Sequence, residues 1–132
     1  MQIISVINQK GGVGKTTSAI NLAAGLSQQN KKILVLDLDP QGNATTGLGL
    51  SNMDNSSETI YGVLNGTKEI INVIKKTQFE NLDIITSNVD LSGLEVETAD
   101  DSNRAFLLKV KLTAYLNNSV GIYDYILIDC PP

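Results

Sequence analysis

Short runs of consecutive aliphatic residues divide the chain and predict its β-strands. They lie at residues 2–8, 33–38, 82–86 and 124–129. Each run is short and mostly aliphatic, and the first reads as a strand that is buried in a parallel sheet. Glycine-rich, polar or charged segments separate these runs from one another. The pattern therefore predicts a sheet that is covered on both sides.

The segments between these runs carry helical or turn patterns. Residues 16–30 contain no charged side chain and repeat apolar residues at helical spacing, and residues 101–118 form a second amphipathic pattern. Shorter helices are predicted at 58–65 and 68–76. Residues 39–57 are rich in Gly, Asn, Ser and Thr without a period, which indicates a long loop with at most a turn of helix. Loops of this length are often functional.

Composition agrees with one α/β domain over residues 1–132. The chain is 42% hydrophobic and 18% charged, which is ordinary for a globular protein. Alternation of strands and helices favours an open, mostly parallel sheet with helices on both faces. A net charge of −4 argues against a nucleic-acid-binding surface in these residues, because such surfaces need an excess of Lys and Arg.

A glycine-rich turn joins the first predicted strand to the first predicted helix. It reads Lys10-Gly11-Gly12-Val13-Gly14-Lys15-Thr16-Thr17. In such a loop successive backbone N–H groups face one centre, and the helix N-terminus adds partial positive charge. Lys15 would reach the β- and γ-phosphates of ATP, and the Thr16 hydroxyl would bind Mg²⁺. A plain strand-to-helix turn is the alternative, but Gly-Lys-Thr at this point of the unit favours a P-loop NTPase.

Two aspartates, Asp37 and Asp39, follow the second aliphatic run, before Pro40. Open α/β sheets bind ligands at the carboxyl ends of their strands. Because side chains alternate along a strand, the two carboxylates would point the same way if the strand ran through both. A carboxylate can hold the attacking water in line with the γ-phosphate, and Asp39 is the candidate for this catalytic role. Without a phosphate loop, turn-forming aspartates would be the simpler interpretation.

The last aliphatic run ends at Asp129, followed by Cys130 and two prolines. An acidic residue at the end of an aliphatic strand is the Walker B arrangement, in which Asp129 would hold Mg²⁺, commonly through water. The motif is weak alone, but the phosphate loop and the aspartates after the second strand support it. Cys130 has no second cysteine for a disulfide or a redox pair, so a structural role is expected.

Taken together, residues 8–17, 33–47 and 123–132 resemble the ParA/Soj family of partition ATPases, part of the MinD/ParA superfamily. Gln9 stands where the standard pattern G-x-x-x-x-G-K-[ST] has glycine. The loop instead matches the deviant Walker A form of these families, K-G-G-x-G-K-[ST], in which Lys10 is an additional lysine. The segment 39–45 is also characteristic of partition proteins.

The resemblance implies roles for individual residues. Residues 10–17 would bind the nucleotide, and Lys10 would reach the phosphates of the partner's nucleotide across an ATP-sandwiched homodimer, as an arginine finger does. Lys10, Lys15 and Asp39 would form the catalytic set. Mg²⁺ would be held by Thr16 and Asp129, with Asp37 nearer its outer shell.

It also implies partners. Such proteins bind non-specific DNA as ATP-dependent dimers in the cytoplasm, on the nucleoid, and a ParB-like partner stimulates hydrolysis while a plasmid or chromosome origin is moved. The sequence covers about half of a family member, so we expect the basic DNA-binding surface, and the adenine contacts, in a half that follows residue 132.

Three alternatives stay open. A MinD-like division-site ATPase shares the phosphate loop but not the segment 40–45, and a nitrogenase-type iron protein would need further cysteines. The chain could also be a catalytically incomplete nucleotide-binding fragment. No run approaches the ~18 apolar residues of a membrane span, and no secretory signal pattern is present, so no membrane association is expected.

Overall fold

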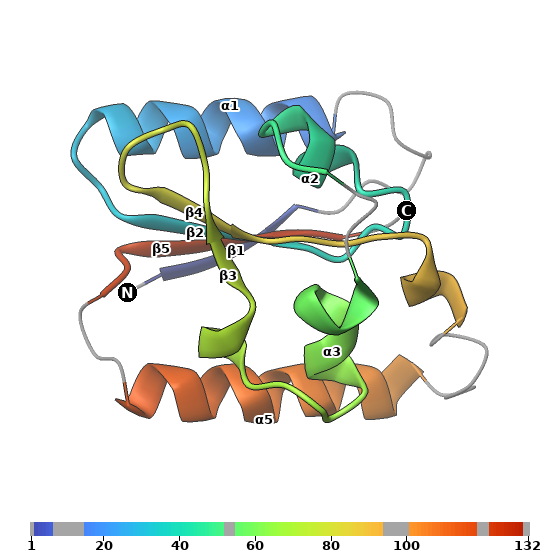
Figure 1. Ribbon diagram of the computed structural model, residues 1–132. Helices are drawn as coiled ribbons and strands as arrows, with labels where there is room; N and C mark the ends of the chain where they lie inside the picture. Colours follow the sequence, from blue (N-terminus) through green and yellow to red (C-terminus); the bar gives the residue numbers. More distant parts are fainter. Residues whose placement is uncertain (1, 7–14, 52–54, 94–100, 119–121, 131–132) are drawn as a thin grey trace.

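The computed structural model describes residues 2–6, 15–51, 55–93, 101–118 and 122–130. Its centre is a five-stranded sheet in the order β1-β5-β2-β4-β3 (Figure 1). The strands are β1 (Gln2–Val6), β2 (Ile33–Asp37), β3 (Ile74–Lys76), β4 (Leu82–Ile85) and β5 (Tyr125–Asp129). All neighbours pair in parallel except β3, which is antiparallel to β4. The predicted strands are confirmed, although positions 7 and 8 of the first lie outside the described residues.

Helices cover both faces of this sheet, as predicted. Helices α1 (Lys15–Gln28) and α2 (Asn43–Gly47) lie on one face, and α3 (Ile60–Leu64) and α5 (Asp101–Asn118) lie on the other (Figure 1). Short 3₁₀ turns occupy Ser56–Glu58 and Ile70–Asn72, and residues 90–93 are helical. Within the described ranges, no helix combines the length and the apolar character that crossing a membrane requires.

Strand β2 lies between two hydrophobic cores, which explains its uninterrupted apolar sequence. Ile33 and Val35 belong to the core beneath α1 and α2, whereas Leu34 and Leu36 belong to the core that α3 and α5 cover. Full burial of each such side chain contributes roughly 1.5–3 kcal/mol. Because side chains alternate along a strand, Asp37, the last residue of β2, lies on the same face as Ile33 and Val35, toward α1 and α2.

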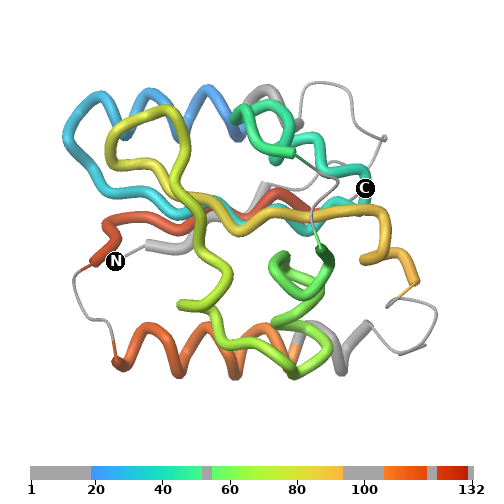
Figure 2. The backbone as a smooth tube through the Cα atoms, in the orientation of Figure 1, coloured from blue at the N-terminus to red at the C-terminus, as the bar shows by residue number. Residues whose placement is uncertain are grey.

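The predicted helix at 68–76 is wrong. Residues Ile70–Asn72 form a single 3₁₀ turn, and the chain then continues as β3, the edge strand of a hairpin with β4 that Figure 2 traces in yellow. Within this hairpin Ile74 pairs with Ile85 and Lys76 with Asp83. The apolar spacing fits a helix, but hydrogen bonding to β4 is available only in the folded sheet and overrides that local preference.

The predicted helix at 58–65 is confirmed as α3. Thr59 caps its N-terminus, because the Thr59 hydroxyl accepts a hydrogen bond from the Tyr61 N–H. The helix ends before Gly66, whose φ of 85° is a left-handed conformation that favours glycine. The predicted loop at 39–57 is interrupted by α2, the turn of helix that its composition allowed.

Candidate nucleotide-binding site

The carboxyl ends of three parallel strands meet at one edge of the sheet. Strand β5 lies between β1 and β2, so that Asp129 is in register with Asp37 on one side and with Val6 on the other. Strand β1 leads from Val6 toward the glycine-rich loop, and α1 begins at Lys15. The two predicted metal-site aspartates and the strand that precedes the phosphate loop are therefore neighbours.

Asp37 is fully buried at this edge, and its carboxylate accepts three hydrogen bonds. The Asp39 N–H donates to Oδ1 at 3.0 Å, and the Thr45 N–H and hydroxyl donate to Oδ2 at 2.9 and 2.7 Å. Burial raises the pKa of Asp37 from 3.8 to about 6, with the nearby charge of Asp129 adding to the rise and the three hydrogen bonds opposing it. Loss of hydration is thus the larger effect.

Asp39 lies beyond the end of β2, so the alternation of a strand does not set its direction. The chain turns here instead, with the Gly42 N–H donating to the Asp39 carbonyl at 2.8 Å and Gly42 at a φ of 66°. The Asp39 carboxylate accepts hydrogen bonds from the Gln41 N–H at 3.0 Å and from the Asn43 side-chain amide at 3.1 Å. Asp39 is buried, with 6% of its surface exposed, and these hydrogen bonds fix the orientation of its carboxylate.

The aspartate pair fits a divalent cation held partly through water. Asp37 and Asp129 are both fully buried and occupy paired positions, so a bound cation would offset two adjacent negative charges. Because three hydrogen bonds already occupy the Asp37 oxygens, Asp37 fits an outer-shell position. No group of three or more His, Cys, Asp or Glu in the described residues could hold a metal ion. Mg²⁺ at a nucleotide usually keeps several waters and is bound through one or two carboxylates together with the phosphates.

The described residues cover the predicted phosphate loop only in part. Positions 10–14 lie outside them, whereas Lys15, Thr16 and Thr17 form the first turn of α1, where a phosphate loop ends. Sequence reasoning gave no role to Thr45. This fully buried hydroxyl residue links α2 to Asp37, and its only sequence signal is a β-branched polar residue inside a short helical turn near the aspartates.

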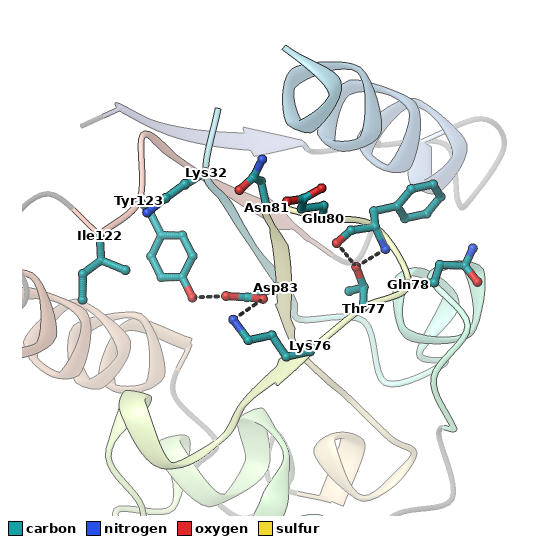
Figure 3. Close-up of a pocket in the computed structure, with 10 residues that line it drawn as sticks. Lys32, Lys76, Thr77, Gln78, Glu80, Asn81, Asp83, Ile122 and Tyr123 are labelled. Carbon is teal, nitrogen blue, oxygen red and sulfur yellow. Dashed lines mark hydrogen bonds and ion pairs between the residues drawn. The ribbon is translucent and has the colours of Figure 1, made fainter. Parts of the chain in front are cut away.

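A separate cavity lies at the opposite edge, where the parallel strands begin. It measures about 530 Å³, and Lys32, Asn81 and Tyr123 line it just before β2, β4 and β5 (Figure 3). The Tyr123 hydroxyl donates to Asp83 Oδ2 at 2.6 Å, and the Lys76 ammonium lies 3.5 Å from Asp83 Oδ1. Burial, followed by the hydrogen bond and charge of Asp83, raises the pKa of Tyr123 far above its ordinary value. These contacts connect β4 to β3 and to the residue preceding β5, at the end of the sheet opposite the aspartate pair.

Comparison with known proteins gives a family match and several similar proteins. The family model described as an AAA domain, AAA_31, matches residues 1–132. The sporulation initiation inhibitor protein Soj of Bacillus subtilis is 46% identical over 131 residues, which are 99% of this chain and 50% of that protein. The chromosome partitioning protein ParA of Caulobacter vibrioides is 42% identical over 132 residues, 100% of this chain and 48% of ParA.

A solved structure shares the fold. Cobyrinic acid a,c-diamide synthase from Mycobacterium smegmatis, with a bound ATP analogue and magnesium, superposes with a TM-score of 0.86 at 35% identity, covering 100% of this chain and 52% of that one. This chain spans about half the length of the curated relatives it matches. Because the family model matches along the entire sequence, the chain belongs to the AAA domain family AAA_31, and it is similar in sequence to the Soj and ParA proteins.

Proposed function

We propose that this chain is the nucleotide-binding part of an ATP-hydrolysing switch of the ParA/Soj type, which acts in chromosome or plasmid partitioning. One observation carries the proposal: Asp37 and Asp129 lie in register, fully buried, at the edge of the sheet where β1 also ends, just before the glycine-rich loop in the sequence. The identity to Soj and ParA supports the partition assignment.

The proposed chemistry is hydrolysis of ATP to ADP and phosphate. Residues 10–17 would bind the phosphates, with Lys15 directed to the β- and γ-phosphates. When bound, Mg²⁺ would neutralise phosphate charge, held by Thr16 and Asp129 with Asp37 in its outer shell. Asp39 would orient the attacking water, because hydrogen bonds from Gln41 and Asn43 fix its carboxylate just beyond the end of β2.

The wider cycle follows from the resemblance to partition proteins. Lys10 would act on the nucleotide of a partner subunit in an ATP-dependent homodimer. That dimer would bind non-specific DNA on the nucleoid in the cytoplasm and would be stimulated by a ParB-like protein. The net charge of −4 supports a DNA-binding surface outside these residues.

Variants of three charged residues test the proposal, in the protein at the full length of its relatives. Lys15→Ala should lose ATP affinity, because Lys15 contacts the nucleotide of its own subunit. Lys10→Ala should bind ATP but fail to dimerise or hydrolyse it. Asp39→Ala should bind ATP and dimerise but remain on DNA, since removing a water-orienting group or a trans cation lowers the rate by roughly 10²–10⁵ with binding nearly intact.

Three measurements distinguish these phenotypes: equilibrium ATP binding, sedimentation with and without ATP, and steady-state phosphate release. Hydrolysis by Asp39→Ala at the parent rate would remove Asp39 from the mechanism. A parent protein that neither binds nor hydrolyses ATP would contradict the proposed function. The same assays on residues 1–132 alone show whether this part binds and hydrolyses ATP by itself. Their result distinguishes an active ATPase from a catalytically incomplete nucleotide-binding fragment.

A further inference from the structure

Thr45 occupies the centre of a buried hydrogen-bond network that joins three elements. Its hydroxyl donates to Asp37 Oδ2 at 2.7 Å and accepts from the Ser87 N–H at 3.0 Å, while its own N–H donates to the same Asp37 oxygen at 2.9 Å. Thr45, Asp37 and Ser87 are all fully buried. The hydroxyl therefore connects α2, the end of β2 and the chain just after β4.

The same network continues to the proposed water-orienting residue by two routes. The Asp37 carboxylate accepts the Asp39 N–H at 3.0 Å, which fixes the Asp39 backbone. Two residues before Thr45, in the same short helix, the Asn43 side-chain amide donates to Asp39 Oδ2 at 3.1 Å. The location of α2 thus sets one contact of the Asp39 carboxylate, and Asp37 sets the position of its main chain.

From this geometry we infer that Thr45 is a positioning residue for ATP hydrolysis, whose hydroxyl fixes α2 and Asp37 so that Asp39 is held in its working orientation. The inference rests on the proposed ATPase function. Thr45 itself touches neither nucleotide nor water in this scheme. Its effect is transmitted through Asn43 and Asp37.

Loss of the hydroxyl would weaken the hydrogen bonding of two buried groups. The Ser87 N–H would lose its acceptor, and Asp37 would lose one of its three donors. A buried polar group without a partner is unfavourable enough that α2 should shift to relieve it. A displacement of about 1 Å at a positioning element can lower a rate by about 10²-fold while substrate binding is little changed.

The neighbouring Thr46 provides a matched control. Among the described residues, its hydroxyl donates to carbonyl groups of its own turn, Gly42 at 3.2 Å and Asn43 at 3.3 Å, and the residue is exposed. Thr46→Val makes the same chemical change at the next position of α2, and it leaves the hydrogen bonds of the buried network in place. Thr45→Ser retains the hydroxyl of Thr45 and removes only a methyl group.

Steady-state ATP hydrolysis and equilibrium ATP binding should be measured for each variant at the full length of the relatives. Thr45→Val should lower kcat by about 10- to 100-fold with the Kd for ATP within about threefold of the parent. Thr45→Ser and Thr46→Val should keep kcat within about threefold. Parent-like turnover by Thr45→Val, or equal loss in Thr45→Ser, would overturn the inference.

Asn43→Ala provides a second variant in case Thr45→Val does not fold. Asn43 is exposed, so its truncation should leave folding intact while it removes the link from α2 to Asp39. Its kcat should fall with ATP affinity retained, and an unchanged kcat would count against the inference.

Amide hydrogen exchange separates this inference from the proposed function, because it needs no nucleotide. In the 132-residue chain, Thr45→Val should speed exchange of the Asp39 N–H relative to the parent and to Thr46→Val. If the parent hydrolyses no ATP, the proposed function fails, whereas this exchange still reports whether Thr45 holds the segment. Equal exchange in Thr45→Val and Thr46→Val would refute the positioning role.

Discussion

Asp37 should make the stability of the nucleotide-free protein depend on pH in an unusual direction. Most carboxylates that accept hydrogen bonds stabilise a fold as they ionise. Asp37 accepts three hydrogen bonds, but burial outweighs them and raises its pKa from 3.8 to about 6. The folded protein therefore binds the Asp37 proton more tightly than the unfolded chain does. Acidification from pH 7 to pH 5 should stabilise the fold through this residue.

The magnitude follows from the two pKa values. The stabilisation is complete below pH 3.8 and is lost as the pH rises through about 6, and a shift of about two units corresponds to about 3 kcal/mol in full. Between pH 7 and pH 5, the contribution of Asp37 to the free energy of unfolding should increase by about 1 kcal/mol. Asp37 is fully buried, so solvent screening does not reduce this figure appreciably.

Urea unfolding at pH 5 and at pH 7, in EDTA and without nucleotide, measures the effect. Other carboxyl groups also titrate in this range, so the quantity to compare is the pH dependence of the parent minus that of Asp37→Asn. The variant carries no ionisable group at this position, and its overall stability does not enter the difference. The parent should gain about 1 kcal/mol more than Asp37→Asn on acidification.

Equal pH dependence in the two proteins would refute this reasoning. It would mean that the hydrogen bonds from Thr45 and Asp39 offset the loss of hydration and that Asp37 has an ordinary pKa in the fold. A smaller pH dependence in the parent would mean that these hydrogen bonds dominate. Addition of Mg²⁺ and ATP should reduce the difference if the cation lies near Asp37, because a cation favours the ionised carboxyl group.

Two further predictions concern packing and the opposite edge of the sheet. Gly62→Ala should destabilise the fold by about 1–3 kcal/mol, because a Cβ at this buried position in α3 would collide with the backbone carbonyl of Ser57. The matched control is Gly25→Ala, at an exposed position of α1 where an added Cβ has no atom within 4 Å, and it should stabilise the fold by about 0.5–1 kcal/mol. Equal melting temperatures for the two variants would contradict this prediction. Tyr123→Phe should cost about 1–2 kcal/mol in urea unfolding, since it removes the 2.6 Å hydrogen bond to Asp83, and an unchanged midpoint would show that Lys76 alone satisfies that carboxylate.

Local burial patterns in the sequence were enough to predict four of the five strands in the described residues, and most of the helices. The consecutive aliphatic residues of β2 and β5 indicate strands covered on both faces, and two hydrophobic cores account for them. The sequence also placed Asp37 and Asp129 at strand ends. In a parallel sheet those ends share one edge, so the location of the site followed from the fold class.

Features that depend on contacts distant in sequence are visible only in the folded protein. The insertion of β5 between β1 and β2 pairs Asp129 with Asp37, and no local pattern specifies strand order. The spacing at 68–76 favoured a helix until pairing with β4 converted its last part into an edge strand. The direction of Asp39 is set by a turn beyond the strand, and the role of Thr45 depends on Ser87, 42 positions away. Partners so far apart meet only when the sheet forms, because hydrogen bonding in the folded core, rather than local propensity, selects them.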